Sequence, residues 1–362
     1  MDKNIKVLHI IPDLSQGGAE RQLVEIAKSN KAHEICLLSS SDKFYHTEIN
    51  NIKIYNLKII KKLPDIRVFY KLMNIIKISQ PSIIQCWMYH SCFLLSLLYQ
   101  FSKLKIPLIW SIRCSDMDVT EYSFKLNLII KFCRYLSHMP NILIHNSHHG
   151  KIIHDNMGFN KNSLVVSNGI DIDKFRPNND YRITFRKKYN IPINAKVFIC
   201  AARIDPMKDH NTLLKAFEIV KKSFSNIYLL LAGRGTNKLL KSDKVIALGE
   251  INNINRAYCA SDYIVSSSAF GEGFSNALGE GMATGLIPIS TKVGDAAYIM
   301  QNIGKLVNIK NINEMAKSMI WSLQLNQEVA ETISKEAIKR IRNDFSTNKM
   351  VQEYFNIYNK LN

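Results

Sequence analysis

Length, composition and charge already narrow the class of protein. The chain has 362 residues, which predicts about two domains at roughly 150 residues each. With 46% hydrophobic and 22% charged residues it has the composition of a folded globular protein, so extensive disorder is excluded. Lys and Arg number 48 against 30 Asp and Glu, a net charge of +18.

This positive charge is divided equally between the two halves of the sequence. Residues 1–170 carry 21 basic and 12 acidic side chains, a difference of +9. Residues 171–362 carry 27 and 18, again +9. A nucleic-acid-binding protein usually concentrates its charge in one stripe or tail, so we expect no nucleic acid as partner. The excess indicates anionic partners in general, such as phosphorylated substrates or anionic lipid.

Cysteine usage and hydropathy indicate the compartment. The seven cysteines are irregularly spaced and form no CxxC pair or Cys/His cluster, a pattern typical of reduced, buried thiols. The chain starts almost directly on an apolar strand, so we expect no signal peptide. The longest apolar stretch, Cys92–Phe101, is too short to span a bilayer. We therefore expect a cytoplasmic protein.

Short apolar segments alternate with helical stretches along the whole chain. The predicted strands are residues 6–11, 34–38, 53–56, 83–86, 107–111, 142–145, 164–166, 196–200, 228–232, 245–248, 263–265 and 287–290. Such alternation predicts parallel sheets covered by helices, an α/β architecture.

Turn and breaker residues cluster from Asn168 to Asn194, and the strand–helix pattern restarts at Val197. The prediction is two doubly wound, Rossmann-like domains facing across a cleft, over residues 1–175 and 176–344. Ligands of such folds bind at the carboxyl ends of the strands, so the loops that follow the strands are the places to search for a site.

The first of these loops, Asp13–Arg21, contains Gly17 and Gly18 directly before a predicted helix. Glycines let a ligand approach the backbone, and a helix start offers N–H groups to an anion. A tight strand-to-helix turn explains the same residues equally well. The loop is neither a GxGxxG dinucleotide fingerprint nor a Walker loop.

A second loop, Ala202–His210, follows the strand at 196–200 and presents Arg203 and Lys208. Two cations at the carboxyl end of a strand can hold a pyrophosphate and neutralise the charge that develops as it leaves. The alternative is a pair of solvated surface cations.

The third loop, Gly271–Ala283, is rich in glycine and leads into an apolar helix. We expect residues 274–276 to form the first helical turn, with backbone N–H groups pointing at an anion. Glu280 lies one to two turns into the helix and can reach hydroxyl groups. Glu272 precedes the helix and is expected to stand free in the cleft. A surface helix would explain Glu280, but not the glycines before it.

This third loop resembles the signature of family 4 glycosyltransferases, which have the GT-B fold. The match is Glu272 and Glu280 within Glu-Gly-Phe-Ser-Asn…Glu-Gly-Met-Ala-x-Gly-x-Pro. Other segments match in order over nearly the whole chain, more specifically in the second half: Gly-Gly-Ala-Glu-Arg at 17–21, Asn-Gly-Ile-Asp at 168–171, Arg203 with Lys208 and His210, Ala-Gly-x-Gly at 232–235, Leu-Gly at 248–249, Ser261-Asp262 and Gly294-Asp295.

The resemblance implies a role for each matching residue. Arg203 and Lys208 would grip the diphosphate of a nucleotide sugar and, with Glu272 at the donor sugar, make up the catalytic group. Glu280 would bind the ribose hydroxyls. The remaining donor-binding residues implied are Gly17 and Gly18 at the diphosphate, Gly249, Glu250 and Ile251 beside the base, and Gly273, Phe274, Ser275 and Asn276 at the phosphates.

The resemblance also implies how the reaction proceeds. Enzymes of this family retain the anomeric configuration and usually need no metal, so we expect neither metal nor cofactor, with the nucleotide sugar as substrate. The fold also implies a last helix near residues 345–362 that crosses back to the first domain.

Departures from the family pattern concern the acceptor side. Arg113 stands near a position where the family often has His. We expect it on the acceptor side, where it would touch an acceptor phosphate or the donor, although it could equally pair with Asp116. Tyr298 stands where the family often has Glu. We assign no nucleophile, because Glu272 and Glu280 lie eight residues apart on one loop and helix, unlike the facing carboxylates about 5 Å apart of a double displacement.

Metal binding has little support in the sequence. Two DxD strings, Asp116–Asp118 and Asp171–Asp173, could in principle hold a divalent ion on a diphosphate. The string is common, however, and one lies in a loop and the other in the predicted hinge. The ten histidines show no metal-ligand spacing.

Two helical segments of the first half, residues 58–77 and 124–139, mix Lys and Arg with large apolar residues. Such helices could lie on an anionic membrane surface, where each cation contributes about 1 kcal/mol. Core-facing helices with solvated lysines are the alternative. Because the acceptor is expected to be lipid-linked, we expect a peripheral location on the inner face of the cell membrane.

Together these observations predict a hexosyltransferase. It would be a retaining glycosyltransferase that moves a sugar from a nucleotide sugar, a UDP-sugar first and GDP-mannose next, to a glycan or lipid-linked acceptor. The pathway, synthesis of O-antigen, capsule or a related polysaccharide, rests on analogy. The oligomeric state is left open.

Two alternatives remain open. One is a nucleotide-sugar epimerase or a phosphorylase on the same fold, which would turn over without a sugar acceptor or would need pyridoxal phosphate. The other is a non-enzymatic basic protein that binds nucleic acid or membranes, which predicts strongly salt-dependent polynucleotide binding.

Overall fold

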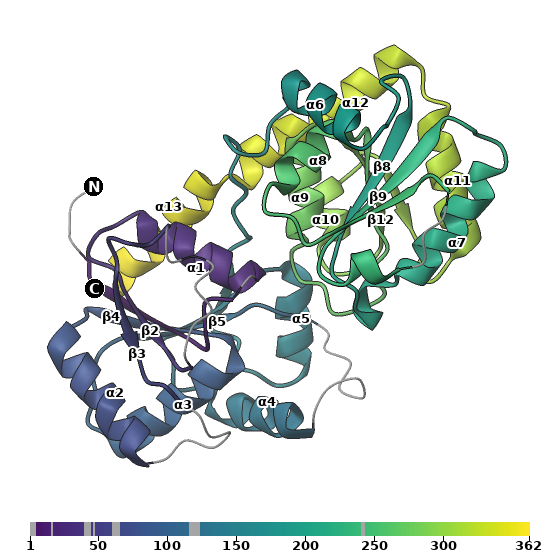
Figure 1. Cartoon of the computed structure of the whole chain (residues 1–362). Coiled ribbons are helices and arrows are strands. Elements are labelled where there is room, and N and C mark those ends of the chain that lie inside the picture. Colours follow the sequence, from purple (N-terminus) through teal and green to yellow (C-terminus); the bar gives the residue numbers. More distant parts are fainter. Residues whose placement is uncertain are drawn as a thin grey trace. The chain divides into compact units, whose positions relative to one another are not determined.

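The computed structural model describes residues 5–15, 17–39, 45, 48–59, 66–115, 124–239 and 243–362. The chain divides into two compact units (Figure 1). Unit 1 comprises Met1–Gly169 and Asn348–Asn362, and unit 2 comprises Ile170–Thr347. Each is built on one parallel sheet with interleaved helices, so the predicted α/β architecture with two Rossmann-like sheets is confirmed.

Unit 1 has a seven-stranded sheet in the order β3-β2-β1-β4-β5-β6-β7. Its elements are β1 (Val7–Ile11), α1 (Gly18–Lys28), β2 (Glu34–Leu37), β3 (Lys53–Asn56), α2 (Ile66–Ser79), β4 (Ile83–Trp87), α3 (Met88–Phe101), β5 (Leu108–Ile112), α4 (Phe124–Leu136), β6 (Ile142–His145), α5 (His148–Asn156), β7 (Ser163–Val165) and α13 (Thr347–Leu361).

The central strands of unit 1 are apolar throughout because both faces of the sheet are covered. Every residue of β1, β4 and β5 is buried. Helices α2, α3 and α4 pack into one hydrophobic core with these strands, and α1 and α13 pack into another. Helix α13 contributes Tyr354 to that second core, and the Tyr358 hydroxyl donates to Gln85 on β4. The last helix of the chain is therefore an integral part of unit 1.

Unit 2 has a six-stranded sheet in the order β10-β9-β8-β11-β12-β13. Its elements are α6 (Asn179–Lys188), β8 (Lys196–Ala201), a 3-10 turn η1 (Pro206–Lys208), α7 (His210–Lys221), β9 (Ile227–Ala232), a 3-10 turn η2 (Thr236–Lys238), β10 (Val245–Gly249), α8 (Ile254–Ala260), β11 (Tyr263–Ser266), α9 (Asn276–Ala283), β12 (Ile287–Thr291), α10 (Ala296–Met300), β13 (Lys305–Val307), α11 (Ile312–Leu323) and α12 (Gln327–Asp344).

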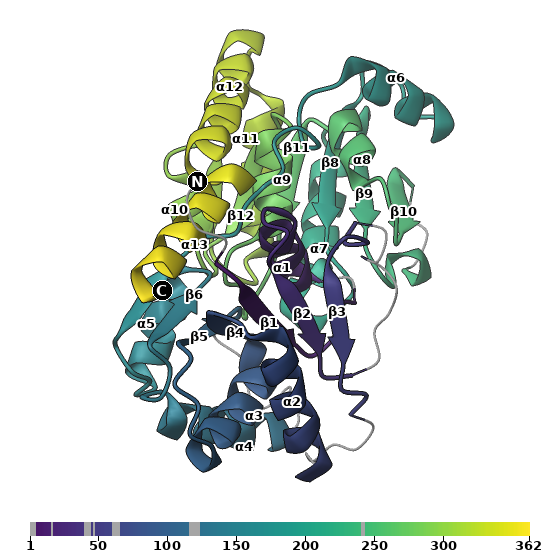
Figure 2. The same ribbon diagram turned by 90° about the vertical axis from the view of Figure 1, so that its left-hand side faces the viewer.

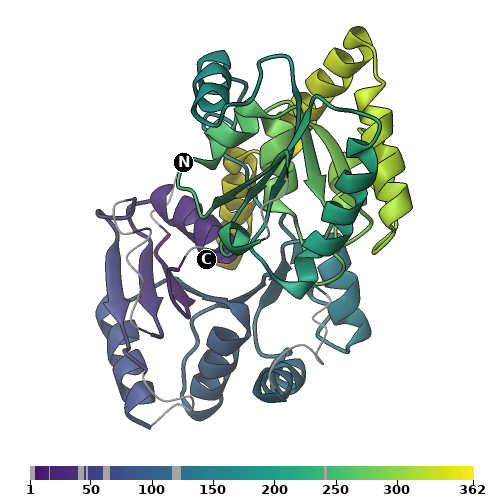
Figure 3. The same cartoon turned by 45° about the vertical axis from the view of Figure 1, so that its right-hand side comes forward.

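Helices cover both faces of this second sheet (Figure 3). Helices α7 and α11 share a core with one face, while α8, α9, α10 and α12 share a core with the other. Two elements were not predicted. Strand β13 has only three residues and no alternation to reveal it. Helix α6 forms within the predicted run of turn residues because the Asn178 side chain caps it, accepting from the Tyr181 N–H at 2.9 Å.

Among the described helices, none combines the length and the apolar character needed to cross a membrane.

A buried ion pair anchors α6 to the sheet of unit 2. Arg186 is 1% exposed and donates to the carbonyl oxygens of Ala260 and Ala195, both at 2.9 Å. Its Nη2 lies 3.0 Å from Asp262 Oδ2, which also accepts from the Val197 N–H of β8 at 2.8 Å. One carboxylate thus holds a helix and a strand together.

Replacing Asp262 with alanine should therefore destabilise unit 2 strongly. The substitution leaves Arg186 charged and buried without its counter-ion, which costs about 3 kcal/mol. Asp344→Ala is the control, because its pair with Arg340 leaves the carboxylate 38% exposed and is worth about 0.5 kcal/mol. Hydrogen exchange of the β8 amides measures both losses. Equal losses in the two variants would contradict this account.

Candidate active site

The loop after β8 is shaped to present Lys208. Asp205 caps the turn η1 by accepting from the Met207 N–H at 3.0 Å, and Pro206 occupies its first position. Asp209 then adopts the left-handed conformation (φ 42°) and caps α7 by accepting from the Thr212 N–H at 3.2 Å. These local bonds fix the backbone of Lys208 at the carboxyl edge of the sheet.

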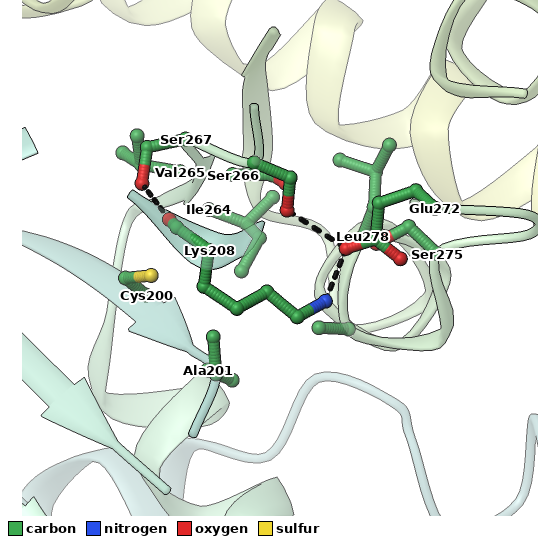
Figure 4. Close-up of a pocket in the computed structure, with 13 residues that line it drawn as sticks. Cys200, Ala201, Lys208, Ile264, Val265, Ser266, Ser267, Glu272, Ser275 and Leu278 are labelled. Atoms are coloured by element: carbon green, nitrogen blue, oxygen red, sulfur yellow. Dashed lines mark hydrogen bonds and ion pairs between the residues drawn. The ribbon is translucent and has the colours of Figure 1, made fainter. Parts of the chain in front are cut away.

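Lys208 forms an ion pair with Glu272 in a small pocket (Figure 4). The two side chains are 17% and 12% exposed. The Ser268 hydroxyl donates to Glu272 Oε1 at 2.8 Å. Burial works to raise the pKa of Glu272, but the charge and hydrogen bond of Lys208, the bond from Ser268 and the charge of Arg203 outweigh it. The net effect holds the pKa of Glu272 below its ordinary value.

The expectation that Glu272 stands free is therefore wrong. A carboxylate this far removed from water needs a counter-charge, and Lys208 provides it. Ser268 was not among the predicted residues, and only its place after strand β11 could have indicated it.

Arg203 acts on the same carboxylate from a more exposed position. Its guanidinium bonds to Asp205 Oδ2, with Nη2 at 2.9 Å and Nε at 3.1 Å. The side chain is 45% exposed. Such an exposed pair contributes little to stability, so a ligand anion could replace Asp205 at small cost. Arg203 and Lys208 thus place two cations at this edge of unit 2, each paired with a carboxylate.

Helix α9 begins beside this ion pair. It starts at Asn276 with Ser275 as N-cap, and the Ser275 side chain makes no capping hydrogen bond. Phe274 precedes the helix rather than forming part of its first turn, because its ring is buried against Phe345 at 5.2 Å. The Gly273 carbonyl accepts from the Asp295 N–H at 3.0 Å, which fixes the loop before the helix.

Glu280 lies inside α9 and is 4% exposed. The Tyr258 hydroxyl donates to its Oε2 at 3.1 Å, which orients the carboxylate. One helical turn of α9 also lies unusually close to β11, because a Cβ at Gly281 would come within 2.8 Å of the Ile264 Cβ. Glycine at this position thus lets the helix approach the strand.

The loop after β10 completes the predicted donor side. Gly249 has φ 69°, and its N–H donates to the Thr236 hydroxyl at 3.0 Å. Glu250 is exposed, and Ile251 packs partly buried against the core. Because β8, β10 and β11 are parallel strands of one sheet, their loops share its carboxyl edge. The fold of unit 2 thus brings the predicted donor-side residues of this unit to one edge.

In unit 1, Gly17 and Gly18 begin α1 at the carboxyl end of β1. A Cβ at Gly17 would lie 2.1 Å from Glu20 Oε2, so glycine makes room for this carboxyl group. The pKa of Glu20 is raised to about 7, mainly by burial and to a smaller extent by the charge of Asp13. A hydrogen bond from its own backbone N–H and the charge of Arg113 oppose this rise. Glu20 belongs to the Gly-Gly-Ala-Glu-Arg segment at 17–21 and is a further candidate site residue, for which no role was predicted.

Arg113 follows β5 at the same edge. Its guanidinium lies over the ring of Trp87 at 4.9 Å, and Nη1 donates to the Tyr354 hydroxyl at 3.3 Å. Its Nε and Nη2 are buried without a hydrogen-bond partner. The alternative pairing with Asp116 lies outside the described residues, as does the Asp116–Asp118 string.

A neutral histidine pair holds Trp87 in place. The indole N–H donates to His9 Nδ1 at 3.3 Å, so His9 carries its proton on Nε2, which lies 3.1 Å from His33 Nδ1. Burial lowers the pKa of His9, reinforced by repulsion from His33, and burial lowers the pKa of His33 to about 4. Neither the two histidines nor Trp87 was predicted as part of a site, since their contacts join three different strands and loops.

The second DxD string, Asp171–Asp173, forms a turn. Asp171 Oδ1 accepts from the N–H groups of Asp173 and Lys174 at 3.1 and 3.0 Å. Across the part of the chain that the structure describes, no group of three or more His, Cys, Asp or Glu is placed to hold a metal ion. All seven cysteines are free thiols, six buried and one half-buried, as expected.

Comparison with known proteins agrees with this geometry. Residues 182–340, within unit 2, match the family described as "Glycosyl transferases group 1". The crystal structure of HepE from Anabaena in complex with UDP is similar over 98% of this chain and 100% of that chain, with a TM-score of 0.85 and 18% identity. The structure of sucrose-phosphate synthase from Thermosynechococcus elongatus is similar over 98% of this chain and 99% of that chain, with a TM-score of 0.80 and 16% identity.

A sequence relative is trehalose synthase from Thermococcus litoralis, 21% identical over 299 residues. The match spans 72% of this chain and 66% of that protein, just under two thirds of its length. The structural likeness shows that the chain has the GT-B fold. The glycosyltransferase group 1 domain, together with this fold, indicates a glycosyltransferase, as predicted.

Replacing Lys208 with methionine should reverse the pH dependence contributed by Glu272. In the wild type the depressed pKa adds stability above the ordinary value of 4.5, which is lost as pH falls through the folded pKa. In the variant the carboxylate stays buried without its cation, so its pKa rises and stability falls as pH increases. The wild type and Lys208→Met should therefore differ little in their free energy of unfolding at pH 4 and by about 3 kcal/mol at pH 7.5, which thermal melting at the two pH values measures. Lys292→Met, at an exposed lysine, is the control; a pH-independent difference for Lys208→Met would refute the pairing.

Replacing Glu20 with glutamine should flatten the pH profile of stability of unit 1. The folded state holds the Glu20 proton up to about pH 7, whereas the unfolded chain releases it near 4.5. The free energy of unfolding therefore falls as pH rises through this window, by about 3 kcal/mol at 1.36 kcal/mol per pH unit. Urea denaturation from pH 4.5 to 8 measures it, with Glu25→Gln on the same helix as control. Parallel profiles for wild type and Glu20→Gln would show that the carboxyl titrates normally.

Proposed function

We propose that this protein is a retaining hexosyltransferase that uses a nucleotide sugar as donor. The observation that carries the proposal is the convergence of Arg203, Lys208 and the start of α9 on one edge of unit 2, with Glu272 buried between them. HepE, which shares the fold, has been solved with UDP and with UDP and glucose. These complexes support a UDP-sugar as the first choice of donor. GDP-mannose is the next candidate by the family resemblance alone.

Breaking the bond between sugar and phosphate leaves a nucleoside diphosphate that gains negative charge. In our proposal Arg203 exchanges Asp205 for the diphosphate, and Lys208 and the first amides of α9 stabilise the charge as it develops. The ionised Glu272 keeps Lys208 in place and faces the positive charge that forms on the sugar. Because fixed cations neutralise the leaving group, the reaction is proposed to need neither a metal ion nor a cofactor.

Recognition of the nucleoside and the acceptor is assigned to other residues. Tyr258 orients Glu280 for the ribose hydroxyls, and Gly249–Ile251 flank the base. On unit 1, the half-buried Arg113 stacked on Trp87 is proposed to act on the acceptor side, toward an anionic group. A lipid-linked or glycan acceptor in the synthesis of O-antigen, capsule or a related polysaccharide fits such a group. A peripheral position on the inner face of the cell membrane belongs to the same proposal.

Titration calorimetry with UDP-glucose, other UDP-sugars and GDP-mannose tests the donor site. Arg203→Ala should weaken binding about tenfold or more, because a charge-assisted hydrogen bond is worth roughly 1.5–3 kcal/mol. Arg256→Ala, which removes an arginine stacked on Tyr181, is the control and should leave binding unchanged. Turnover with a sugar acceptor should retain the anomeric configuration and persist in EDTA.

Three results would overturn the proposal. The first is that no nucleotide sugar binds. The second is that Arg203→Ala and Arg256→Ala weaken donor binding equally. The third is that the protein interconverts nucleotide sugars without an acceptor, which would indicate an epimerase. Loss of turnover in EDTA, restored by Mg²⁺ or Mn²⁺, would overturn its metal-free part.

A further inference from the structure

Two described stretches of unit 1 carry positive charge without any acidic residue. Residues 66–115 and 124–154 contain ten Lys or Arg and no Asp or Glu. The even division of charge between the two halves of the sequence hides this concentration, because the acidic residues of the first half all lie outside these two ranges. The question is where the fold places the cations.

The structure gathers them on the outside of one helical layer. Helices α2, α3 and α4 pack into a single core on one face of the seven-stranded sheet, on the other side from α1 and α13 (Figures 1 and 2). Their buried positions recur at helical spacing, for example Val68, Leu72 and Ile76 on α2. Between the buried positions of α2 and α4 lie six exposed cations: Arg67, Lys71, Lys77, Lys125, Lys131 and Arg134. Two more, Lys103 and Lys105, are exposed in the segment between α3 and β5.

Large apolar side chains are exposed among these cations. Phe101 (84%), Tyr135 (76%), Tyr70 (73%) and Ile66 (66%) are the four most exposed large apolar side chains in the described part of the chain. Ile78, Leu128 and Phe132 on the same helices are also exposed. We call these seven side chains and the eight cations the basic–apolar face. Exposed apolar groups in such density mark an interaction surface.

We propose that the basic–apolar face docks the protein on a lipid bilayer that contains anionic lipid. Lys and Arg would contact the lipid phosphates, and the aromatic and aliphatic side chains would enter the boundary between headgroups and acyl chains. The described residues 66–115 and 124–154 contain no acidic side chain that would repel an anionic surface. Aliphatic Ile66, Ile78 and Leu128 gain nothing from stacking on nucleic-acid bases, so a bilayer fits the face better than a polynucleotide.

This inference deepens the proposed function, since it names the surface that would bring unit 1 to a lipid-linked acceptor. It rests on the charge and exposure of the helical layer, however, and not on the donor site of unit 2. Binding to vesicles and binding of nucleotide sugars can therefore be measured separately, and either can fail without the other.

Sedimentation with vesicles tests the proposal on the full-length protein. The vesicles are phosphatidylcholine alone, or phosphatidylcholine with phosphatidylglycerol. The face variant combines Lys71→Gln, Lys77→Gln, Lys131→Gln and Arg134→Gln. Its matched control combines Lys187→Gln, Lys222→Gln, Lys335→Gln and Lys339→Gln, four exposed lysines of unit 2. Both lower the net charge from +18 to +14, so they separate the position of the charge from its amount.

The wild type and the control should bind the anionic vesicles alike, and the face variant about tenfold or more weakly. An apolar variant with Tyr70→Ser, Phe101→Ser and Tyr135→Ser should also bind weakly, whereas Ile193→Ser, Ile309→Ser and Val329→Ser in unit 2 should not change binding. Circular dichroism and unchanged nucleotide-sugar binding show that each variant is folded.

Equal loss in the face and control variants would overturn the proposal, because binding would then follow net charge alone. Equal binding of the wild type to neutral and anionic vesicles would overturn the role of the cations. Absence of vesicle binding with strong, salt-dependent binding of a DNA or RNA oligonucleotide would replace the bilayer with a polynucleotide as partner.

Discussion

The half-buried pair of Lys208 and Glu272 is the interaction on which the candidate active site depends. Each charge would be costly in this pocket alone, and together they hold the loop after β8 against the loop before α9. The pair keeps an ammonium group at the sheet edge, while Arg203 nearby remains exposed and paired only with Asp205. Lys208 is thus held in place by Glu272, whereas Arg203 can exchange Asp205 for an anionic ligand.

The carboxyl edge of unit 1 follows a different electrostatic design. In this unit burial lowers the pKa of His9 and His33 and raises the pKa of Glu20 to about 7, and the Arg113 guanidinium is placed by stacking on Trp87 and not by a carboxylate. Burial is the common cause, because it disfavours every charged form that lacks a partner. Two nitrogens of Arg113 are buried without a hydrogen-bond partner. This edge is therefore suited to an anionic group, as the proposed acceptor role requires.

The helical layer of unit 1 shows how one sequence pattern serves two surfaces. Residues at helical spacing face the sheet and form the core, while those between them combine cations with exposed aromatic and aliphatic groups. In α12, by contrast, acidic and basic residues alternate along the exposed face, as is usual for a solvated helix. The charge pattern thus distinguishes an interaction surface from a solvated one.

The α/β class, twelve of the thirteen described strands and the loops that carry Arg203, Lys208 and Glu280 could be predicted from sequence patterns, whereas the last helix was implied by the family resemblance. Strand burial, helix periodicity and glycine-rich turns are local properties, so they can be read along the chain. The folded chain was needed to show that Glu272 is paired and not free. It also shows that Ser268 orients Glu272 and that Tyr258 orients Glu280. Finally, it brings Trp87, His9 and His33 together behind Arg113. Except for the bond from Ser268 to Glu272, these contacts link residues 20 to 80 positions apart, and their partners are chosen by strand order and burial, which no local pattern encodes.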